Sequence, residues 1–95
     1  MGDYQGRTGM ADVVIYTSAM CPYCVAAKNL LAKKGAAYTE IRVDLDRGKR
    51  EEMMARTKRT SVPQIFIGGT HVGGFDDMVA LDRQGGLDPL LGSAA

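Results

Sequence analysis

The chain has two cysteines, Cys21 and Cys24, and two residues separate them. An apolar run, 13–16, precedes the pair, and a segment typical of a helix, 25–34, follows it. A Cys-x-x-Cys pair between a strand and a helix, in a chain without a secretory signal, indicates a redox-active dithiol. The thiolate of Cys21 would attack a disulfide, and Cys24, one helical turn further on, would resolve the mixed disulfide that forms.

The expected position of Cys21 at the start of a helix favours its thiolate form. Pro22 suits the first position of a helix, which places Cys21 at or near the N-cap. Unpaired backbone N–H groups and the positive end of the helix dipole would then face its sulfur. Both stabilise a negative charge, so the thiolate would be available at neutral pH.

The composition predicts one small domain and excludes several classes of partner. The 95 residues are 45% hydrophobic, which suffices for a modest core. The net charge is +1, from 12 basic and 11 acidic residues, so neither nucleic acid nor a membrane surface is expected as a partner. Tryptophan is absent, and no apolar run approaches the roughly 20 residues of a transmembrane helix.

The N-terminal residues differ from the rest of the chain. Residues 1–9 are polar and glycine-rich and lack the hydrophobic stretch of a signal peptide. Met10 would serve as a natural start, so we expect residues 1–10 to be a flexible leader or extension and residues 11–92 to form the domain. The expected location is the cytoplasm, where a structural disulfide would be unusual.

The hydrophobic pattern predicts the order β-α-β-α-β-β-α. Asp44 and Asp46 offer N-cap oxygens for the second helix, and Asp76 or Asp77 for the third. Gly68 and Gly69 predict a hairpin, whereas the first two strands should be parallel, so the sheet is mixed with helices on its faces. We expect strands at 12–17, 38–43, 64–67 and 70–72, helices at 22–34, 47–57 and 77–83, and a last turn at 87–91.

Three segments together resemble the dithiol glutaredoxins, particularly those of the bacterial glutaredoxin 3 type. They are Cys21-Pro22-Tyr23-Cys24, Thr60-Ser61-Val62-Pro63 and Gly73-Gly74-Phe75-Asp76-Asp77, and the similarity extends over roughly 11–91. The resemblance implies a thioredoxin fold, in which a four-stranded mixed sheet carries helices on both faces. It implies a glutathione-dependent thiol–disulfide oxidoreductase that reduces glutathione mixed disulfides and protein disulfides. Glutathione would be the reducing co-substrate, with no metal and no tightly bound cofactor.

The resemblance also assigns roles around the two thiols. Cys21 would be the nucleophile and Cys24 the resolving thiol. Pro63 would follow a cis peptide bond, and the backbone N–H and C=O of Val62 would pair with the cysteinyl residue of glutathione, as an added strand would.

The resemblance also implies which residues contact the two ends of glutathione. Gly74, Phe75 and Asp76 would hold the γ-glutamyl end, whose carboxylate would meet N–H groups at a helix N-terminus. The Asp77 carboxylate would face the ammonium group. Arg59 matches a position that contacts the glycine carboxylate in relatives.

This chain departs from the family pattern at three positions. Many relatives carry a lysine three residues before the first cysteine, where this chain has Ser18. Ser61, in the glutathione groove, replaces the usual threonine. Phe75 replaces a residue that is often cysteine or another small group, so the floor of the groove is expected to be more apolar. Tyr23, between the thiols, would line the same groove.

Other interpretations of the cysteine pair remain open. A closed zinc site usually needs four ligands, whereas the chain offers only Cys21, Cys24 and His71. A zinc site within one chain is therefore not expected, and a metal site shared by two subunits is the metal-binding alternative. In an iron–sulfur carrier, two subunits would each supply Cys21 and two glutathiones would complete the ligands. A third alternative is a protein with the same fold that receives its electrons from thioredoxin reductase and not from glutathione.

We otherwise expect a monomer that acts on glutathionylated or disulfide-containing proteins. Ribonucleotide reductase and a sulfate-assimilation reductase are both compatible protein targets. His71, on a hairpin strand, is expected to be a solvated or edge residue.

Overall fold

The computed structural model describes residues 11–92, and the leader expected at 1–10 lies outside the described residues. The expected order of strands and helices is confirmed, and the last turn is a short helix. The elements are β1 (Val13–Thr17), α1 (Pro22–Lys33), β2 (Thr39–Arg42), α2 (Arg47–Thr57), β3 (Gln64–Ile67), β4 (Thr70–Gly73), α3 (Phe75–Arg83) and α4 (Leu87–Leu91).

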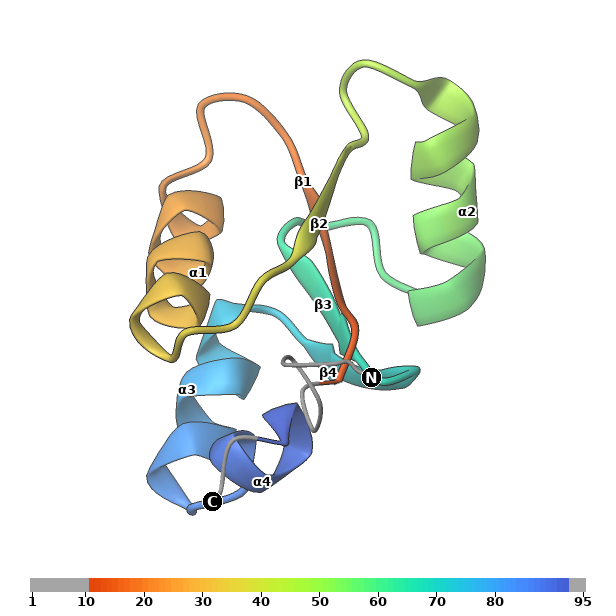
Figure 1. Ribbon diagram of the computed structural model, residues 1–95. Helices are drawn as coiled ribbons and strands as arrows, with labels where there is room; N and C mark the ends of the chain where they lie inside the picture. The colour runs from red at the N-terminus through yellow and green to blue at the C-terminus, as the bar shows by residue number, and fades with distance from the viewer. Residues whose placement is uncertain (1–10, 93–95) are drawn as a thin grey trace, which may run out of the picture.

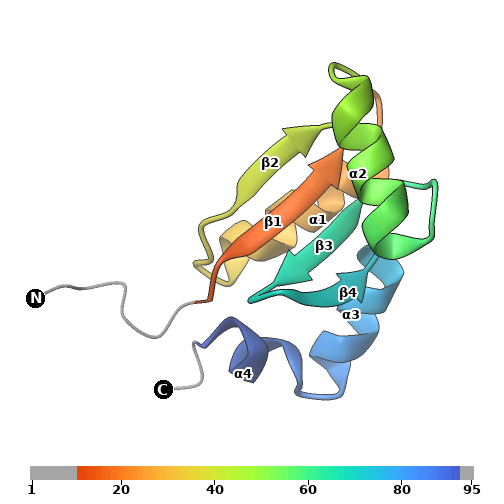
Figure 2. The same ribbon diagram turned by 90° about the vertical axis from the view of Figure 1, so that its right-hand side faces the viewer.

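The four strands form one mixed sheet in the order β2-β1-β3-β4, as Figure 2 shows. β1 and β2 are parallel, whereas β3 is antiparallel to both β1 and β4. The predicted hairpin joins β3 to β4 through Gly68 and Gly69, whose φ angles are 57° and 84°. Glycine adopts such positive angles without the steric cost that a Cβ brings, so this tight connection suits the sequence.

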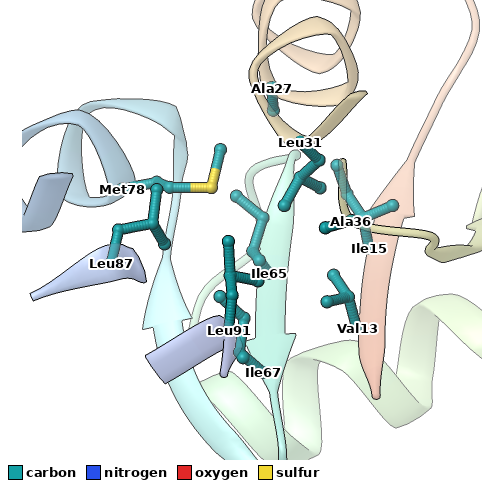
Figure 3. Packing of buried hydrophobic residues seen from close by; sticks show 10 residues of the cluster. All are labelled: Val13, Ile15, Ala27, Leu31, Ala36, Ile65, Ile67, Met78, Leu87 and Leu91. Carbon is teal, nitrogen blue, oxygen red and sulfur yellow. The ribbon is translucent and has the colours of Figure 1, made fainter. Parts of the chain in front are cut away.

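The sheet separates two hydrophobic layers because side chains alternate along each strand. Val13 and Ile15 of β1 face α1, α3 and α4, and Figure 3 shows them packed with Leu31, Met78 and residues of β3. Tyr16 faces the other layer, beneath α2. Figure 1 shows the result, with α2 on one side of the sheet and α1 and α3 on the other. Helices therefore lie on both faces of a four-stranded mixed sheet, which is the arrangement that the implied thioredoxin fold predicts.

The start of α3 differs from the prediction. The sequence predicts Asp76 or Asp77 as the N-cap of a helix that starts near residue 77, but the N-cap is Gly74 and the helix begins at Phe75. Asp77 instead occupies the third helical position, where its Oδ2 accepts a hydrogen bond from the Gly74 N–H at 2.8 Å. For α2, Asp46 is the N-cap, while Asp44 accepts hydrogen bonds from the Arg42 guanidinium.

A buried tyrosine links β1 to α2. Tyr16 is fully buried, and its hydroxyl donates to Glu52 Oε2 at 2.6 Å and accepts from Arg56 Nη1 at 2.8 Å. The pKa of Tyr16 is raised, first by burial and second by the hydrogen bond to Glu52. The two charged residues lie on adjacent turns of α2, so one hydroxyl holds the helix over the sheet. Within 11–92, no helix is both long enough and apolar enough to cross a membrane.

Replacing Leu31 with alanine should lower the free energy of unfolding by about 2–5 kcal/mol, the usual loss for a buried leucine. Leu31 is fully buried between α1 and the sheet. Urea denaturation measures the change. Leu45→Ala is the matched control, because Leu45 is 74% exposed and its loss should stay within about 0.5 kcal/mol. Equal losses in the two variants would contradict this assignment of the core.

Candidate functional site

Cys21 lies at the N-cap of α1, as predicted. Its backbone is extended, with φ −122° and ψ 97°, and Pro22 occupies the first helical position. Its Sγ accepts a hydrogen bond from the Cys24 N–H at 3.1 Å. The helix therefore directs an N–H group and the positive end of its dipole at this sulfur, which stabilises a thiolate there without a separate base.

The two cysteines are joined as a disulfide, and their exposure differs. Their Cα atoms lie 5.2 Å apart, within the range that a disulfide spans without backbone movement. Cys24 is only 1% exposed, whereas Cys21 is partly exposed. An incoming thiolate can reach the sulfur of Cys21 but not that of Cys24, so burial distinguishes the two thiols.

The loop before β3 lies against the disulfide. The Val62–Pro63 peptide bond is cis, as the resemblance implied. Val62 O lies 3.9 Å from Cys21 Sγ, although 41 positions separate the two residues in the sequence. The loop thus presents backbone polar groups beside the reactive sulfur, which is the arrangement needed to pair with the backbone of a bound peptide.

A pocket of about 270 Å³ opens beside this loop. The rings of Tyr23 and Phe75 lie at the pocket with their centroids 6.2 Å apart, so an aromatic surface borders it. The pocket brings together eight residues that the sequence predicted for glutathione: Tyr23, Ser61, Val62, Pro63, Gly74, Phe75, Asp76 and Asp77.

Arg59, the remaining predicted residue, bonds to Asp77. Arg59 Nη1 donates to Asp77 Oδ2 at 2.9 Å, and both side chains are close to half exposed. The pKa of Asp77 lies below its ordinary value, first because the Gly74 N–H donates to the carboxylate and second because the Arg59 guanidinium does. Asp77 is therefore a carboxylate at neutral pH, and it lines the pocket in which the resemblance places an ammonium group opposite it.

The backbone at β4 is shaped around this carboxylate. Gly73 has φ 116°, and a Cβ at this position would collide with the Asp77 side chain. Glycine is required here both for the turn and for the close approach of Asp77 to the Gly74 N–H.

Ser18, at the position where the resemblance led us to expect a lysine in many relatives, lies in the loop between β1 and α1. Its hydroxyl donates to Ala19 O at 3.4 Å, and the Ala19 N–H donates to Asp44 Oδ2 at 3.2 Å. This loop is therefore tied to the loop that follows β2. Met20, just before Cys21, and Leu45, just after Asp44, are 96% and 74% exposed.

Two polar residues near the site were not predicted from the sequence. Gln64 is fully buried, and its Nε2 donates to Ser61 O at 3.1 Å. The expectation that His71 is a solvated or edge residue is confirmed, because β4 is an edge strand, but it did not include the partners of this side chain. His71 is on the edge strand, but its Nε2 lies 2.7 Å from Gln64 Oε1 and its ring stacks on Phe66. A glutamine inside the apolar run of β3 was the available signal, because a buried amide needs partners.

Metal ligands do not gather around the cysteines in the part of the chain that the structure describes. Across 11–92, no group of three or more His, Cys, Asp or Glu side chains is arranged to hold a metal ion.

Comparison with known proteins assigns the family. The family model described as Glutaredoxin matches residues 13–72. The chain is 57% identical to Glutaredoxin 3 of Escherichia coli strain K12 over 82 residues, which is 86% of this chain and 99% of that protein.

Two solved structures share the fold and the family. The solution structure of glutaredoxin from Brucella melitensis is 50% identical, with a TM-score of 0.79, and the match covers 92% of this chain and 95% of that one. A crystal structure of a buckwheat glutaredoxin–glutathione complex is 32% identical, with a TM-score of 0.79 over 85% of this chain and 76% of that one. With an accessible cysteine at a helix N-cap, a buried partner thiol and a matching fold, this chain belongs to the glutaredoxin family and is a thiol–disulfide oxidoreductase.

Proposed function

We propose that the protein uses glutathione to reduce glutathione mixed disulfides and protein disulfides. The observation that carries this proposal is the joint position of three groups. The accessible Cys21 sulfur lies beside the Val62 carbonyl, and Val62 lines the same pocket as Asp77, whose side chain is a carboxylate. The buckwheat relative, which was crystallised as a glutaredoxin–glutathione complex, supports the choice of thiol.

Reduction of a glutathionylated substrate needs only Cys21. The Cys21 thiolate attacks the glutathione sulfur of the mixed disulfide, so an S–S bond forms between Cys21 and glutathione and the substrate thiolate leaves. A glutathione thiolate then attacks the glutathione sulfur of that intermediate. This step releases oxidised glutathione and returns the Cys21 thiolate, which the helix N-terminus stabilises as the leaving group.

Reduction of a protein disulfide uses both thiols. Cys21 attacks one substrate sulfur and the other leaves as a thiolate. Cys24 then attacks Cys21, which releases the reduced protein and forms the Cys21–Cys24 disulfide seen in the structure. One glutathione opens this bond at the accessible Cys21 sulfur and a second releases oxidised glutathione. A separate reductase regenerates the glutathione.

Binding of glutathione in the pocket follows from its charges and backbone. Val62 would pair with the cysteinyl backbone, and the γ-glutamyl carboxylate would meet the N–H groups at the start of α3, near Gly74, Phe75 and Asp76. The Asp77 carboxylate would face the ammonium group. Arg59 would leave its exposed ion pair with Asp77 to contact the glycine carboxylate, which costs little because exposed ion pairs contribute about 0–1 kcal/mol.

The same surface suits a protein substrate. Met20, Tyr23, Val25 and Leu45 are exposed apolar side chains on α1, on the loop before it or on the adjoining loop after β2. A monomer in the reducing cytoplasm completes the proposal, since glutathione keeps thiols reduced there. Glutathionylated and disulfide-containing proteins, ribonucleotide reductase among them, are the proposed targets.

Replacing each cysteine with serine separates the two thiols. Cys21→Ser should abolish glutathione-dependent reduction of a small glutathione mixed disulfide, because it removes the nucleophile. Cys24→Ser should keep that activity and lose the reduction of protein disulfides. Oxidation of NADPH, coupled through glutathione reductase, measures turnover. Activity that survives in Cys21→Ser would overturn the proposal, and wild-type reduction by thioredoxin reductase alone would assign a different electron donor.

Replacing Asp77 with asparagine should raise the KM for glutathione about tenfold, the effect of about 1.4 kcal/mol, and leave kcat little changed. The variant removes the charge that faces the ammonium group but keeps an oxygen that can accept from Gly74. Asp82→Asn is the matched control, because Asp82 lies on the same helix and pairs with Lys34 at 2.8 Å. A similar rise in both variants would show a general effect on α3 and contradict the assigned contact.

The charge of Asp77 should persist to low pH. Its pKa is lowered in the folded protein, so its contribution to stability is present above the unfolded pKa of about 3.9 and is lost as pH falls through the lower folded value. Titration of the carboxyl carbon by NMR measures the pKa. Arg59→Gln should raise it only part of the way to the ordinary value, since the Gly74 N–H remains, and no change in that variant would contradict the observed ion pair.

A further inference from the structure

We propose that Gln64 and His71 are positioning residues that aim the Val62 N–H at the bound peptide. The inference rests on the proposed function, because it deepens the role of the Val62 backbone in holding glutathione. It concerns two residues that the thiol chemistry itself does not use, and that are joined by a short chain of hydrogen bonds.

Donor and acceptor are fixed in each hydrogen bond that links His71, Gln64 and Ser61. Gln64 Nε2 donates to Ser61 O at 3.1 Å and lies 3.4 Å from Ser61 Oγ. A carbonyl oxygen only accepts, so the amide nitrogen of Gln64 must face Ser61 and its Oε1 must face His71. Because Oε1 also only accepts, His71 Nε2 carries the hydrogen and donates across the 2.7 Å contact.

The bond to Ser61 O determines where the next N–H points. The carbonyl of Ser61 and the N–H of Val62 belong to one planar peptide unit, and in the trans form these two groups point in opposite directions. The cis bond is the following one, between Val62 and Pro63. Holding the Ser61 carbonyl toward the buried Gln64 therefore turns the Val62 N–H away from the sheet. Ser61 and Val62 both line the pocket, where this N–H can meet a substrate carbonyl.

His71 is held firmly enough to act as the anchor. It lies opposite Phe66 in the pairing of β3 with β4, and the two rings stack with centroids 4.9 Å apart. Burial is the first cause that lowers its pKa. The Nε2–H donor is present in the imidazolium and in one neutral tautomer, and the bond to Gln64 selects that tautomer. Donation to Gln64 is thus available in both protonation states.

The polarity of this chain makes it testable by substitution at position 71. His71→Gln keeps a donor and should retain the wild-type KM for glutathione. His71→Leu removes the donor and should raise that KM about fivefold, the effect of losing about one hydrogen bond. His71→Glu offers only acceptors, so Gln64 must turn its Nε2 toward position 71 and its Oε1 toward the Ser61 carbonyl. The repulsion should raise the KM further, while kcat stays within twofold in all three.

The control and a second variant guard against a general loss of structure. Thr70→Val changes the neighbouring exposed residue of β4 and should leave the KM unchanged. Gln64→Met fills a similar volume without the amide, so it should raise the KM for glutathione about as much as His71→Leu does. It tests the same hydrogen bonds independently if His71→Leu folds poorly. An equal rise in Thr70→Val, or an unchanged KM in both His71→Leu and Gln64→Met, would overturn the inference.

A measurement without glutathione separates this inference from the proposed function. The NMR shifts of the Ser61 carbonyl carbon and of the Val62 amide should move in His71→Leu and His71→Glu but stay in place in His71→Gln. Unchanged shifts in His71→Glu would overturn the inference whatever the thiol donor is. Absence of glutathione turnover in the wild type would instead overturn the proposed function, and the shifts would still report whether the chain of bonds exists.

Discussion

The antiparallel pairing of β1 with β3 is the constraint on which the site depends. Tyr16, near the end of β1, pairs with Gln64, the first residue of β3. The loop that leaves β1 and the loop that enters β3 therefore meet at the same end of the sheet. This register brings the Cys21 sulfur within 3.9 Å of the Val62 carbonyl. A slip of one residue in either strand would turn the buried side chains of that strand to the opposite face, so two hydrophobic layers hold the register.

The second antiparallel pairing, of β3 with β4, completes the site by the same geometry. The end of β4 lies beside the start of β3, so the turn at Gly73 and Gly74 reaches the loop that contains Val62. This turn starts α3 and holds the Asp77 carboxylate, through the Gly74 N–H, among the residues that line the pocket. One end of a small sheet thus carries the sulfur at a helix N-terminus, the backbone edge that we propose pairs with a peptide, and the carboxylate that we propose faces an ammonium group.

Burial distinguishes two side chains that are chemically identical. Cys21 and Cys24 are both thiols, yet one lies at the surface at the N-cap and the other is 1% exposed. In the proposed mechanism, the partly exposed sulfur exchanges with partners from solution, while the buried one reacts only with its neighbour Cys21. The buried amide of Gln64 shows the complementary effect. It is retained in an apolar strand because each of its polar atoms has a partner, and those partners belong to the loop before β3 and to the edge strand β4.

The sequence alone determined what depends on local periodicity and on short motifs. The order of the elements, the N-cap position of Cys21 and the glycine turn between β3 and β4 were predicted, because each rests on residues close together in the chain. The resemblance supplied the residues that line the pocket, and the structure brings eight of them together. Only the tertiary structure decided which polar groups pair. Arg59 with Asp77, Tyr16 with Glu52 and Arg56, and His71 with Gln64 join different elements. Such pairs follow from the strand register and the helix packing, which hydrophobic spacing in one segment does not specify.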